Sequence, residues 1–389
     1  LNQFALLNPN ITSEMIDGGL YQNVVAERDI QGVPSVYLNG ELFANGKVDA
    51  SVLIDKLIER DPSLKEANKG ESLPLQDVTV IGGGPAGVAS AIYSARKGLK
   101  VTVVADRFGG QVKDTMGIEN LISVSKTTGP ELVGNLMEHM NDYDITLKEH
   151  VRVDSVEQGN VKTITLSSGE QIRTRSIIVA TGARWRELGV PGEKENVGNG
   201  VAYCPHCDGP FFKGKDVAVI GGGNSGIEAA LDLAGIVKSV TVFEFMPELK
   251  ADQVLIDQAE KRENITIIRN AATHQITAEN GKVNAIEYQD RNTTELHTLP
   301  LSGVFVQIGL VPNSQFMEGV VDMSKYGEIV IDTKCNTSAP GIFAAGDVTT
   351  VPYKQIVISM GEGAKASLAA FEYLLSHEVI EMDEETQAA

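Results

Sequence analysis

The chain has 389 residues, of which 42% are hydrophobic and 22% charged, a composition typical of globular proteins. Its formal net charge of −19 argues against a nucleic-acid or anionic-membrane surface, because both need clustered Lys and Arg. No apolar run approaches the ~20 residues of a membrane span, and three cysteines are too few for a disulfide-stapled secreted protein, so we expect a cytoplasmic protein.

The N-terminal segment predicts a strand–turn–strand unit at residues 32–40 (GVPSVYLNG), followed by an amphipathic helix at residues 50–60. Residues 61–76 are polar and punctuated by Pro and Gly, which is typical of a linker. At the other end, residues 377–389 read as an acidic tail with frayed structure.

Two segments of the chain repeat one another. Residues 81–105 and 220–244 both begin IGGG, continue into an Ala-rich helical pattern and return to a Val-Thr-Val strand. Each is a predicted βαβ unit with a GxGxxG fingerprint at its first turn: Gly82, Gly84 and Gly87, then Gly221, Gly223 and Gly226. The glycines permit a tight turn, close approach to a pyrophosphate, and packing of helix on strand, while the helix N-terminus attracts the anion. Two such units predict two dinucleotides, FAD and NAD(P).

The residue that ends the second strand of each unit refines this prediction. Glu244 stands where a carboxylate would accept from both ribose hydroxyls, and no Arg cluster follows it to bind a 2′-phosphate. We therefore expect NADH rather than NADPH. In the first unit the residue equivalent to Glu244 is Ala105, and the carboxylate of Asp106 stands one position later. Asp106 is therefore either a ribose ligand or a solvated turn residue.

Two further segments fit the first unit. Residues 176–183 (SIIVATGA) predict a buried strand that ends in a turn at Gly182, and residues 341–348 (GIFAAGDV) predict another that ends in Gly346 and Asp347. Asp347 could reach a ribityl hydroxyl or could cap a helix. Because the latter segment follows the second fingerprint, we expect the first domain to be interrupted by the second.

Cys204 and Cys207 form a CxxC pair, the spacing of a readily exchanged disulfide. A zinc site would need further paired ligands, which the remaining Cys and His do not supply, and an inert disulfide does not suit the expected compartment. We favour a redox role. Asp208, next to Cys207, is placed to move a proton to or from a thiolate, or is a turn carboxylate. Cys335, in a strand-like run, reads as a small buried hydrophobe.

These motifs carry a family resemblance. GGGPAG, FGGQ, ATGA, CPHCDG, GGGNSG and AAGDV, in that order, resemble the low-molecular-weight thioredoxin reductase group of flavoproteins, and within it the flavoprotein subunit of alkyl hydroperoxide reductases. The resemblance spans about residues 77–375. It implies electron flow from NADH to FAD to the disulfide, with Cys207 facing the flavin, Cys204 exchanging with other thiols and Asp208 as acid/base. It also implies that Gly110, Gln111, Lys354 and Gln355 lie near the flavin.

The implied fold class is α/β, with two Rossmann-like three-layer dinucleotide-binding domains after a partial thioredoxin-like segment. The expected divisions are 1–60, a partial thioredoxin-like domain without its CxxC; 61–76, a linker; 77–188, the first part of the FAD domain; 189–302, the NADH domain with the CxxC; 303–376, the second part of the FAD domain; and 377–389, the tail. The resemblance further implies a homodimer and a peroxiredoxin-type peroxidase partner. In that family an N-terminal CxxC passes electrons to the partner; no cysteine precedes Cys204 here, so we expect an N-terminally truncated chain.

Three other functions stay open on the sequence alone. The first is thioredoxin reductase itself, and the second is an NADH oxidase that makes hydrogen peroxide. The third is a non-enzymatic docking module that uses dinucleotide folds only for binding.

Overall fold

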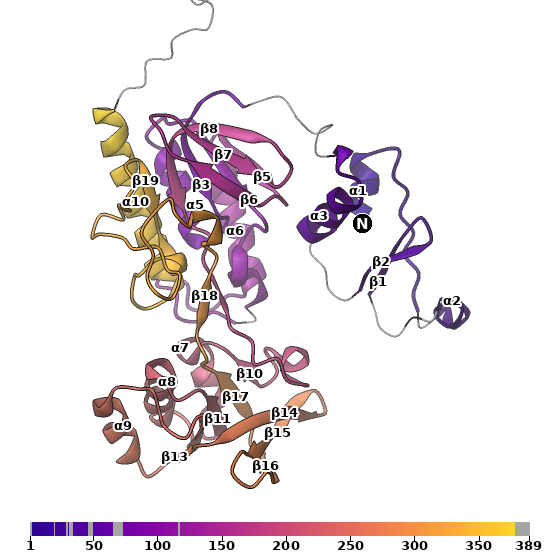
Figure 1. Cartoon of the computed structure of the whole chain (residues 1–389), viewed down its shortest axis with the longest axis vertical. Helices are drawn as coiled ribbons and strands as arrows, with labels where there is room; N and C mark the ends of the chain where they lie inside the picture. The colour runs from indigo at the N-terminus through magenta and orange to yellow at the C-terminus, as the bar shows by residue number, and fades with distance from the viewer. Residues whose placement is uncertain are drawn as a thin grey trace, which may run out of the picture.

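The computed structural model describes residues 2–18, 20–28, 30, 34–45, 50–64, 73–115 and 117–377 (Figure 1). Parts of three expected segments lie outside the described residues: Gly32 and Val33 of the N-terminal motif, residues 65–72 of the linker, and residues 378–389 of the tail. No helix in the described ranges is long and apolar enough to cross a membrane.

The strand–turn–strand unit expected at residues 32–40 is displaced, because the described part of that range holds one strand and the turn while the second strand follows at residues 41–45; the helix expected at residues 50–60 is present. Helices α1 (Asn2–Leu7) and α2 (Gln22–Glu27) precede strands β1 (Ser35–Leu38) and β2 (Glu41–Asn45), which pair antiparallel, and helix α3 (Ala50–Arg60) follows. Asn39 and Gly40 both have positive φ, 52° and 88°, as a two-residue Asn-Gly hairpin turn requires.

The first large unit is built on a seven-stranded sheet. Its order is β5-β4-β3-β8-β7-β6, with β19 also paired to β8. The strands are β3 (Gln76–Ile81), β4 (Val101–Ala105), β5 (Ile145–Glu149), β6 (Val153–Glu157), β7 (Lys162–Leu166), β8 (Gln171–Val179) and β19 (Ile342–Ala344). The pairs β3–β4, β4–β5, β3–β8 and β8–β19 are parallel. Helices α5 (Pro85–Ala95), α6 (Gly129–Asn141) and α10 (Ile356–Ser376) pack on this unit (Figure 1).

The second unit has a five-stranded parallel sheet of order β10-β17-β11-β12-β13. The strands are β10 (Val201–Ala202), β11 (Asp216–Ile220), β12 (Ser239–Phe243), β13 (Ile265–Ile268) and β17 (Gly303–Val306), with helices α7 (Pro205–Asp208), α8 (Asn224–Ala234) and α9 (Gln253–Glu260). A separate antiparallel sheet joins β14 (Ala271–Glu279), β15 (Lys282–Asp290) and β16 (Leu296–Pro300). These two large sheets, each with a glycine fingerprint after a parallel strand, confirm the predicted α/β class with two Rossmann-like units.

The expected boundary between residues 302 and 303 is wrong by one strand. Gly303–Val306 is β17, which lies between β10 and β11 in the second sheet. All four of its residues are buried and apolar or Gly, so its pattern does not tell which sheet it joins. The chain returns to the first unit only after Val306, where β18 (Leu310–Pro312) pairs antiparallel with the outgoing β9 (Ala183–Trp185). Figure 1 shows β18 running between the two units.

Helix α10 completes the first unit by packing against α5. A side chain at Gly363 would collide with the carbonyl oxygen of Ala86, and the Ser90 hydroxyl donates to the Gly363 carbonyl at 3.0 Å. The hydroxyls of Ser94 and Ser367 are 2.8 Å apart. The contact at Gly363 brings the N-terminal half of α10 to the first glycine fingerprint.

Candidate functional site

The first fingerprint turn has two kinds of glycine. Gly82 has a φ of 121°, and a Cβ on it would collide with the Ala180 carbonyl; a Cβ on Gly87 would collide with the Gly82 carbonyl. Both glycines are therefore required by the protein's own packing. Gly84 differs, since it begins α5 with ordinary extended backbone, and an added Cβ would meet no atom within 4 Å.

The second fingerprint turn repeats this division. Gly221 has a φ of 118°, and a Cβ on it would lie 2.5 Å from the Gln307 carbonyl oxygen, while one on Gly226 would collide with the Gly221 carbonyl. Gly223 begins α8 and has open space beside it. The middle glycine of each fingerprint thus stands at a helix N-terminus with room for a ligand, which fits a dinucleotide pyrophosphate.

Glu244 follows β12 and is 8% exposed. Its Oε2 accepts from the Gly222 amide at 2.6 Å, and its Oε1 accepts from the Met246 amide at 2.7 Å. A carboxylate has about four acceptor positions, so these two bonds leave capacity for ribose hydroxyls. The structure therefore places Glu244 at the second fingerprint turn.

Three predicted residues of the first unit lie in the segment after β4, which contacts the first fingerprint through the Gly109 amide, a donor to the Gly83 carbonyl at 2.8 Å. A Cβ on Gly110, in the short helix η1 (Gly110–Asp114), would be 3.7 Å from Gly84 Cα, so the two glycines face each other. The Gln111 amide donates to the Ala183 carbonyl. Asp106 Oδ2 accepts from Arg152 Nε at 3.1 Å, and its buried Oδ1 has no hydrogen-bond partner within the described part of the chain. An orphaned carboxylate oxygen at this strand end fits a ribose hydroxyl.

The segment at Gly346 and Asp347 lies against the same fingerprint. A Cβ on Gly346, in η5 (Gly346–Val348), would be 3.0 Å from Ala86 Cβ. Asp347 Oδ1 accepts from the Ser359 hydroxyl at 3.1 Å, and burial raises the pKa of this carboxyl despite that bond and the charge of Lys354. Lys354 donates to Glu328 at 3.2 Å and to the Thr349 carbonyl at 2.5 Å.

Gly182 has a φ of 68° and open space at its Cα, at the end of the strand segment that leads to β9. Its carbonyl accepts from the Asn313 amide at 3.0 Å, next to β18. The structure places it at the connection between the units.

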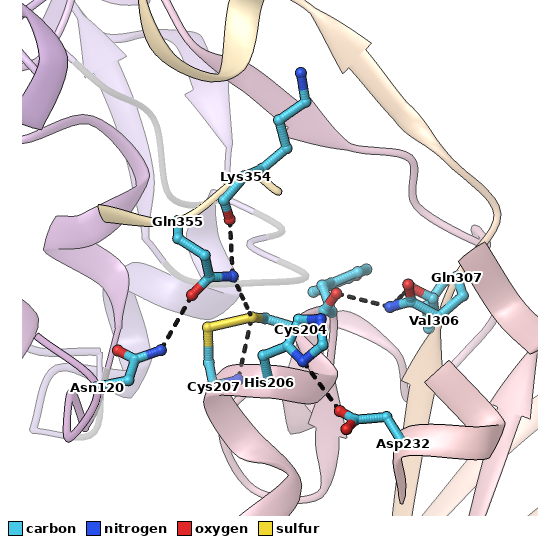
Figure 2. Close-up of a disulfide and its surroundings, with 10 residues drawn as sticks. Asn120, Cys204, His206, Cys207, Asp232, Val306, Gln307, Lys354 and Gln355 are labelled. Carbon is cyan, nitrogen blue, oxygen red and sulfur yellow. Dashed lines mark hydrogen bonds and ion pairs between the residues drawn. A yellow bond between two sulfur atoms is a disulfide. The ribbon is translucent and has the colours of Figure 1, made fainter. Parts of the chain in front are cut away.

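Cys204 and Cys207 form a disulfide, with 5.2 Å between their Cα atoms (Figure 2). Cys204 caps α7, and its Sγ accepts from the Cys207 amide at 3.2 Å. Nε2 of Gln355, the residue before α10, lies 4.0 Å from this sulfur, and the Asn120 amide donates to Gln355 Oε1 at 3.1 Å. The disulfide of the second unit thus faces the α10 N-terminus of the first.

Asp208 ends α7 beside the disulfide. Desolvation by burial raises the pKa of its carboxyl to about 6. A carboxyl with this pKa can exchange protons near neutral pH, as a group that serves a thiol must. His206, by contrast, is mostly exposed, and its Nδ1 lies 3.0 Å from Asp232 Oδ2 on α8 (Figure 2).

The prediction that Cys335 lies in a strand is wrong. Its φ is 66°, and its amide donates to the Asp332 carbonyl at 3.0 Å, so it closes a turn that begins at Asp332. The thiol is buried, as expected, and donates to Glu362 Oε2 at 3.0 Å. Burial, with the nearby Glu362 carboxylate, raises its pKa above the usual range, so the thiol stays protonated.

Sequence reasoning missed several residues of the site. Asn120, Ser359 and Arg152 each contact a predicted residue, from segments without a motif. Glu193 and Tyr203, which bond to each other at 2.9 Å, were also missed. Within the described ranges, no group of three or more His, Cys, Asp or Glu residues could hold a metal ion.

Comparison with known proteins agrees with this geometry. The family "Pyridine nucleotide-disulphide oxidoreductase" matches residues 76–363. The F subunit of alkyl hydroperoxide reductase in Escherichia coli (strain K12) is 50% identical over 379 residues, which are 96% of this chain and 73% of that protein. A Bacillus subtilis (strain 168) protein named NADH dehydrogenase is 52% identical over 375 residues, with the same coverage. The crystal structure of thioredoxin reductase from Streptococcus pyogenes MGAS5005 is 33% identical, with a TM-score of 0.74 over 78% of this chain and 99% of that one.

These relatives confirm the predicted oxidoreductase, its FAD and NAD(P)H cofactors, and the resemblance to the flavoprotein of alkyl hydroperoxide reductases. Such chemistry requires two dinucleotide sites and a redox disulfide. The open space at the two middle glycines and the Cys204–Cys207 disulfide, which lies in the second unit and faces the first, meet these requirements. The chain belongs to the pyridine nucleotide-disulphide oxidoreductase family and is an FAD-dependent disulfide oxidoreductase.

Proposed function

We propose that the chain reduces its own Cys204–Cys207 disulfide with NADH and that the resulting dithiol then reduces a disulfide of another protein. The observation that carries this proposal is the position of the disulfide, with Gln355 Nε2 4.0 Å from Cys204 Sγ at the N-terminus of α10. The net reaction is NADH + H⁺ + disulfide → NAD⁺ + two thiols. When bound, the nicotinamide would supply a hydride, and FAD would supply its acceptance and the onward transfer of the electron pair.

The first unit is the proposed FAD site. Gly82, Gly84 and Gly87 would cradle the pyrophosphate at the start of α5, and Asp106 would accept from a ribose hydroxyl. The remaining proposed contacts to FAD come from Gly110, Gln111, Gly182, Gly346, Asp347, Lys354 and Gln355. On this proposal the FAD domain comprises residues 77–188 and the chain after residue 306, up to residue 376.

The second unit is the proposed NADH site. Gly221, Gly223 and Gly226 would bind the pyrophosphate at the start of α8, while Glu244 would accept from the ribose hydroxyls. A carboxylate at this position repels a 2′-phosphate, which supports NADH over NADPH.

At the disulfide, we assign Cys207 to the flavin side and Cys204 to exchange with other thiols. Reduction of the disulfide needs two protons, and Asp208, whose pKa is raised to about 6, would deliver one of them to a thiolate. The Cys207 amide, which donates to Cys204 Sγ, favours a thiolate at Cys204 once the bond is open.

The onward partner is proposed from the relatives. Several are named as the F subunit of alkyl hydroperoxide reductase, so we propose that electrons pass on to a peroxiredoxin-type peroxidase. From the family resemblance alone, we also propose that the protein acts as a homodimer. Cys204 is the first cysteine of these 389 residues. Purified as this sequence, the chain should therefore need an added dithiol carrier to drive peroxide turnover, and full coupling without a carrier would contradict that expectation.

An anaerobic NADH titration followed through the flavin spectrum tests the proposed function. The wild type should take up about two electron pairs per flavin, and two new thiols should appear. Cys207→Ser should take up about one pair and yield no new thiols. A wild type that stops at one pair would overturn the proposal and leave a plain NADH oxidase.

Thioredoxin reductase is the second candidate, favoured by the likeness to the Streptococcus pyogenes enzyme. Reduction of thioredoxin with NADPH, at a rate above that of the NADH-driven peroxidase assay with a dithiol carrier, would select it.

A further inference from the structure

Tyr203, directly before Cys204, is the point at which both connections between the units meet. We propose that the Glu193 carboxylate and the Tyr203 phenol form a positioning pair that fixes the disulfide segment to these two connections. This inference rests on the proposed function, since it concerns the delivery of electrons to Cys204–Cys207. Neither residue would touch the reacting atoms; they act through the backbone at Cys204.

Glu193 is fully buried, at 0% exposed, although it carries a carboxylate. Its Oε1 accepts from the Leu188 amide at 2.8 Å and from the Tyr203 hydroxyl at 2.9 Å, and its Oε2 accepts from the Gly189 amide at 2.7 Å. Short bonds to an ionised acceptor are about twice as strong as neutral ones. Glu193 therefore ties the outgoing connection, at Leu188 and Gly189, to the residue before the disulfide.

Tyr203 adds two more attachments. Its ring stacks on Trp185 of β9, with centroids 6.2 Å apart and planes at 17°. Its carbonyl accepts from Gln307 Nε2 at 2.7 Å, and Gln307 is the first residue of the returning connection. Gln307 in turn packs its own carbonyl against Gly221 of the second fingerprint.

Two effects hold the Tyr203 phenol in its donor form. Desolvation by burial and the hydrogen bond to Glu193 raise its pKa above the usual range. The phenol thus stays protonated at any working pH, and the bond to Glu193 persists.

The pair matters because electron delivery depends on where the disulfide sits. A misplacement of about 1 Å can cost about 10²-fold in rate. If Tyr203 loses its bond to Glu193, the segment that carries Cys204 loses a side-chain attachment to the outgoing connection. The contacts within the two glycine fingerprints do not change. Electron transfer to the Cys204–Cys207 disulfide should then slow, and the affinity for NADH should not change.

The test compares Tyr203→Phe and Glu193→Gln with Tyr143→Phe in the flavin-loaded protein. The Tyr143 phenol also takes part in a hydrogen bond, from Arg96 Nη1 at 3.0 Å, but lies in the first unit away from the disulfide. Tyr203→Phe keeps the aromatic ring and removes only the hydroxyl, so it should fold. In anaerobic single turnover, both pair variants should form thiols at Cys204 and Cys207 about tenfold more slowly, which corresponds to about 1.4 kcal/mol, whereas flavin reduction by NADH should be unchanged.

Trp185 offers a second readout, because it is the single tryptophan of the sequence. Its quenching by acrylamide should rise in both pair variants and not in Tyr143→Phe. Wild-type rates of thiol formation together with unchanged quenching would overturn the positioning pair. A wild type that forms no thiols with NADH would instead overturn the proposed function, so the two failures are distinguishable.

Discussion

The amide of Gly222 donates a hydrogen bond of 2.6 Å to Oε2 of Glu244, which joins the second fingerprint turn to the end of β12. A Cβ on Gly222 would lie 2.6 Å from the same oxygen, so the two residues are in close contact. The carboxylate proposed to recognise the ribose thus also shapes the turn proposed to hold the pyrophosphate.

Glu244→Gln should weaken NADH binding by about 10–100-fold, because a bond to a charged acceptor contributes about 1.5–3 kcal/mol and an amide NH₂ would face one of the two backbone donors. Calorimetric titration of NADH into the protein measures this loss. Glu263→Gln, on an exposed side chain, is the control. Equal affinity for NADH in both variants would show that Glu244 is only structural.

Substitution of the middle glycine in each fingerprint should abolish the binding of one cofactor and leave the binding of the other intact. Gly84→Ala should purify without flavin, whereas Gly223→Ala should keep its flavin and lose NADH binding, since each added methyl group enters the space proposed for one pyrophosphate. Neither change meets a protein atom within 4 Å, so both variants should fold. Flavin absorbance and NADH calorimetry distinguish them, and a Gly84→Ala protein that stays yellow contradicts the assignment.

Gly87→Ala serves as the contrasting variant to Gly84→Ala. Its methyl group would collide with the Gly82 carbonyl, so the thermal midpoint should fall even in protein stripped of flavin. Differential scanning calorimetry of the stripped proteins makes the comparison. Equal midpoints for the two variants would mean that the third glycine is not needed for packing.

Asp208 should give stability a pH dependence of unusual sign. Its folded pKa of about 6 lies above the usual 3.8, so the folded protein binds the extra proton between these values and loses stability as pH rises through about 4 to 6. The loss is at most about 3 kcal/mol. Asp208→Asn should lack this contribution, so it should gain stability relative to wild type at pH 7 and not at pH 4. Denaturant unfolding at both pH values, with Asp144→Asn as control, checks this.

Asp208→Asn should also slow thiol formation by about 10²-fold, because an amide cannot deliver a proton to the departing thiolate. In the wild type the rate should fall above about pH 6, where the carboxyl ionises. The variant should show no such limb in a stopped-flow pH profile. A profile shared by both proteins would remove Asp208 from the proton path.

Lys162 is almost fully buried, and within the described ranges its Nζ donates to neutral groups, the Arg175 carbonyl at 3.0 Å and the Tyr373 hydroxyl at 3.2 Å. Desolvation lowers its pKa, so the folded protein binds this proton less well than the unfolded chain and gains stability as pH rises toward 10. Burying a cation away from a carboxylate costs several kcal/mol, which exceeds the roughly 1 kcal/mol of each hydrogen bond.

Lys162→Met should therefore raise the thermal midpoint at pH 7, by an amount that shrinks as pH approaches 10. Lys261→Met, on an exposed side chain, should change little. Calorimetry at pH 7 and pH 9.5 measures both variants. A lower midpoint for Lys162→Met at pH 7 would show that the two hydrogen bonds outweigh the desolvation.

Local features were predictable from the sequence. The fingerprints at Gly82 and Gly221, the Asn39–Gly40 hairpin turn and the disulfide at Cys204 each depend on residues within a few positions of one another. Such features follow from backbone conformation and spacing, which a sequence displays directly.

Features made by distant segments were not predictable. The membership of β17 in the second sheet depends on pairing with β10 and β11, and a buried apolar strand carries no mark of its neighbours. The turn at Cys335 is an exception, since it was missed although it depends on a nearby residue, Asp332, whose side chain accepts from the amides of Lys334 and Asn336. The Glu193–Tyr203 bond joins two residues of ordinary type, which no motif marks.

The pairing of β19 with β8 has a consequence for biosynthesis. The C-terminal half of β8 lies between β3 and β19, yet β19 leaves the ribosome only after the entire second unit has been made. Until then one edge of β8 presents unpaired backbone groups, which can recruit foreign strands. The second unit, completed by β17, can close first. Translation pauses between residues 306 and 342 should therefore prolong the exposure of β8, and chaperone association should peak for nascent chains of that length.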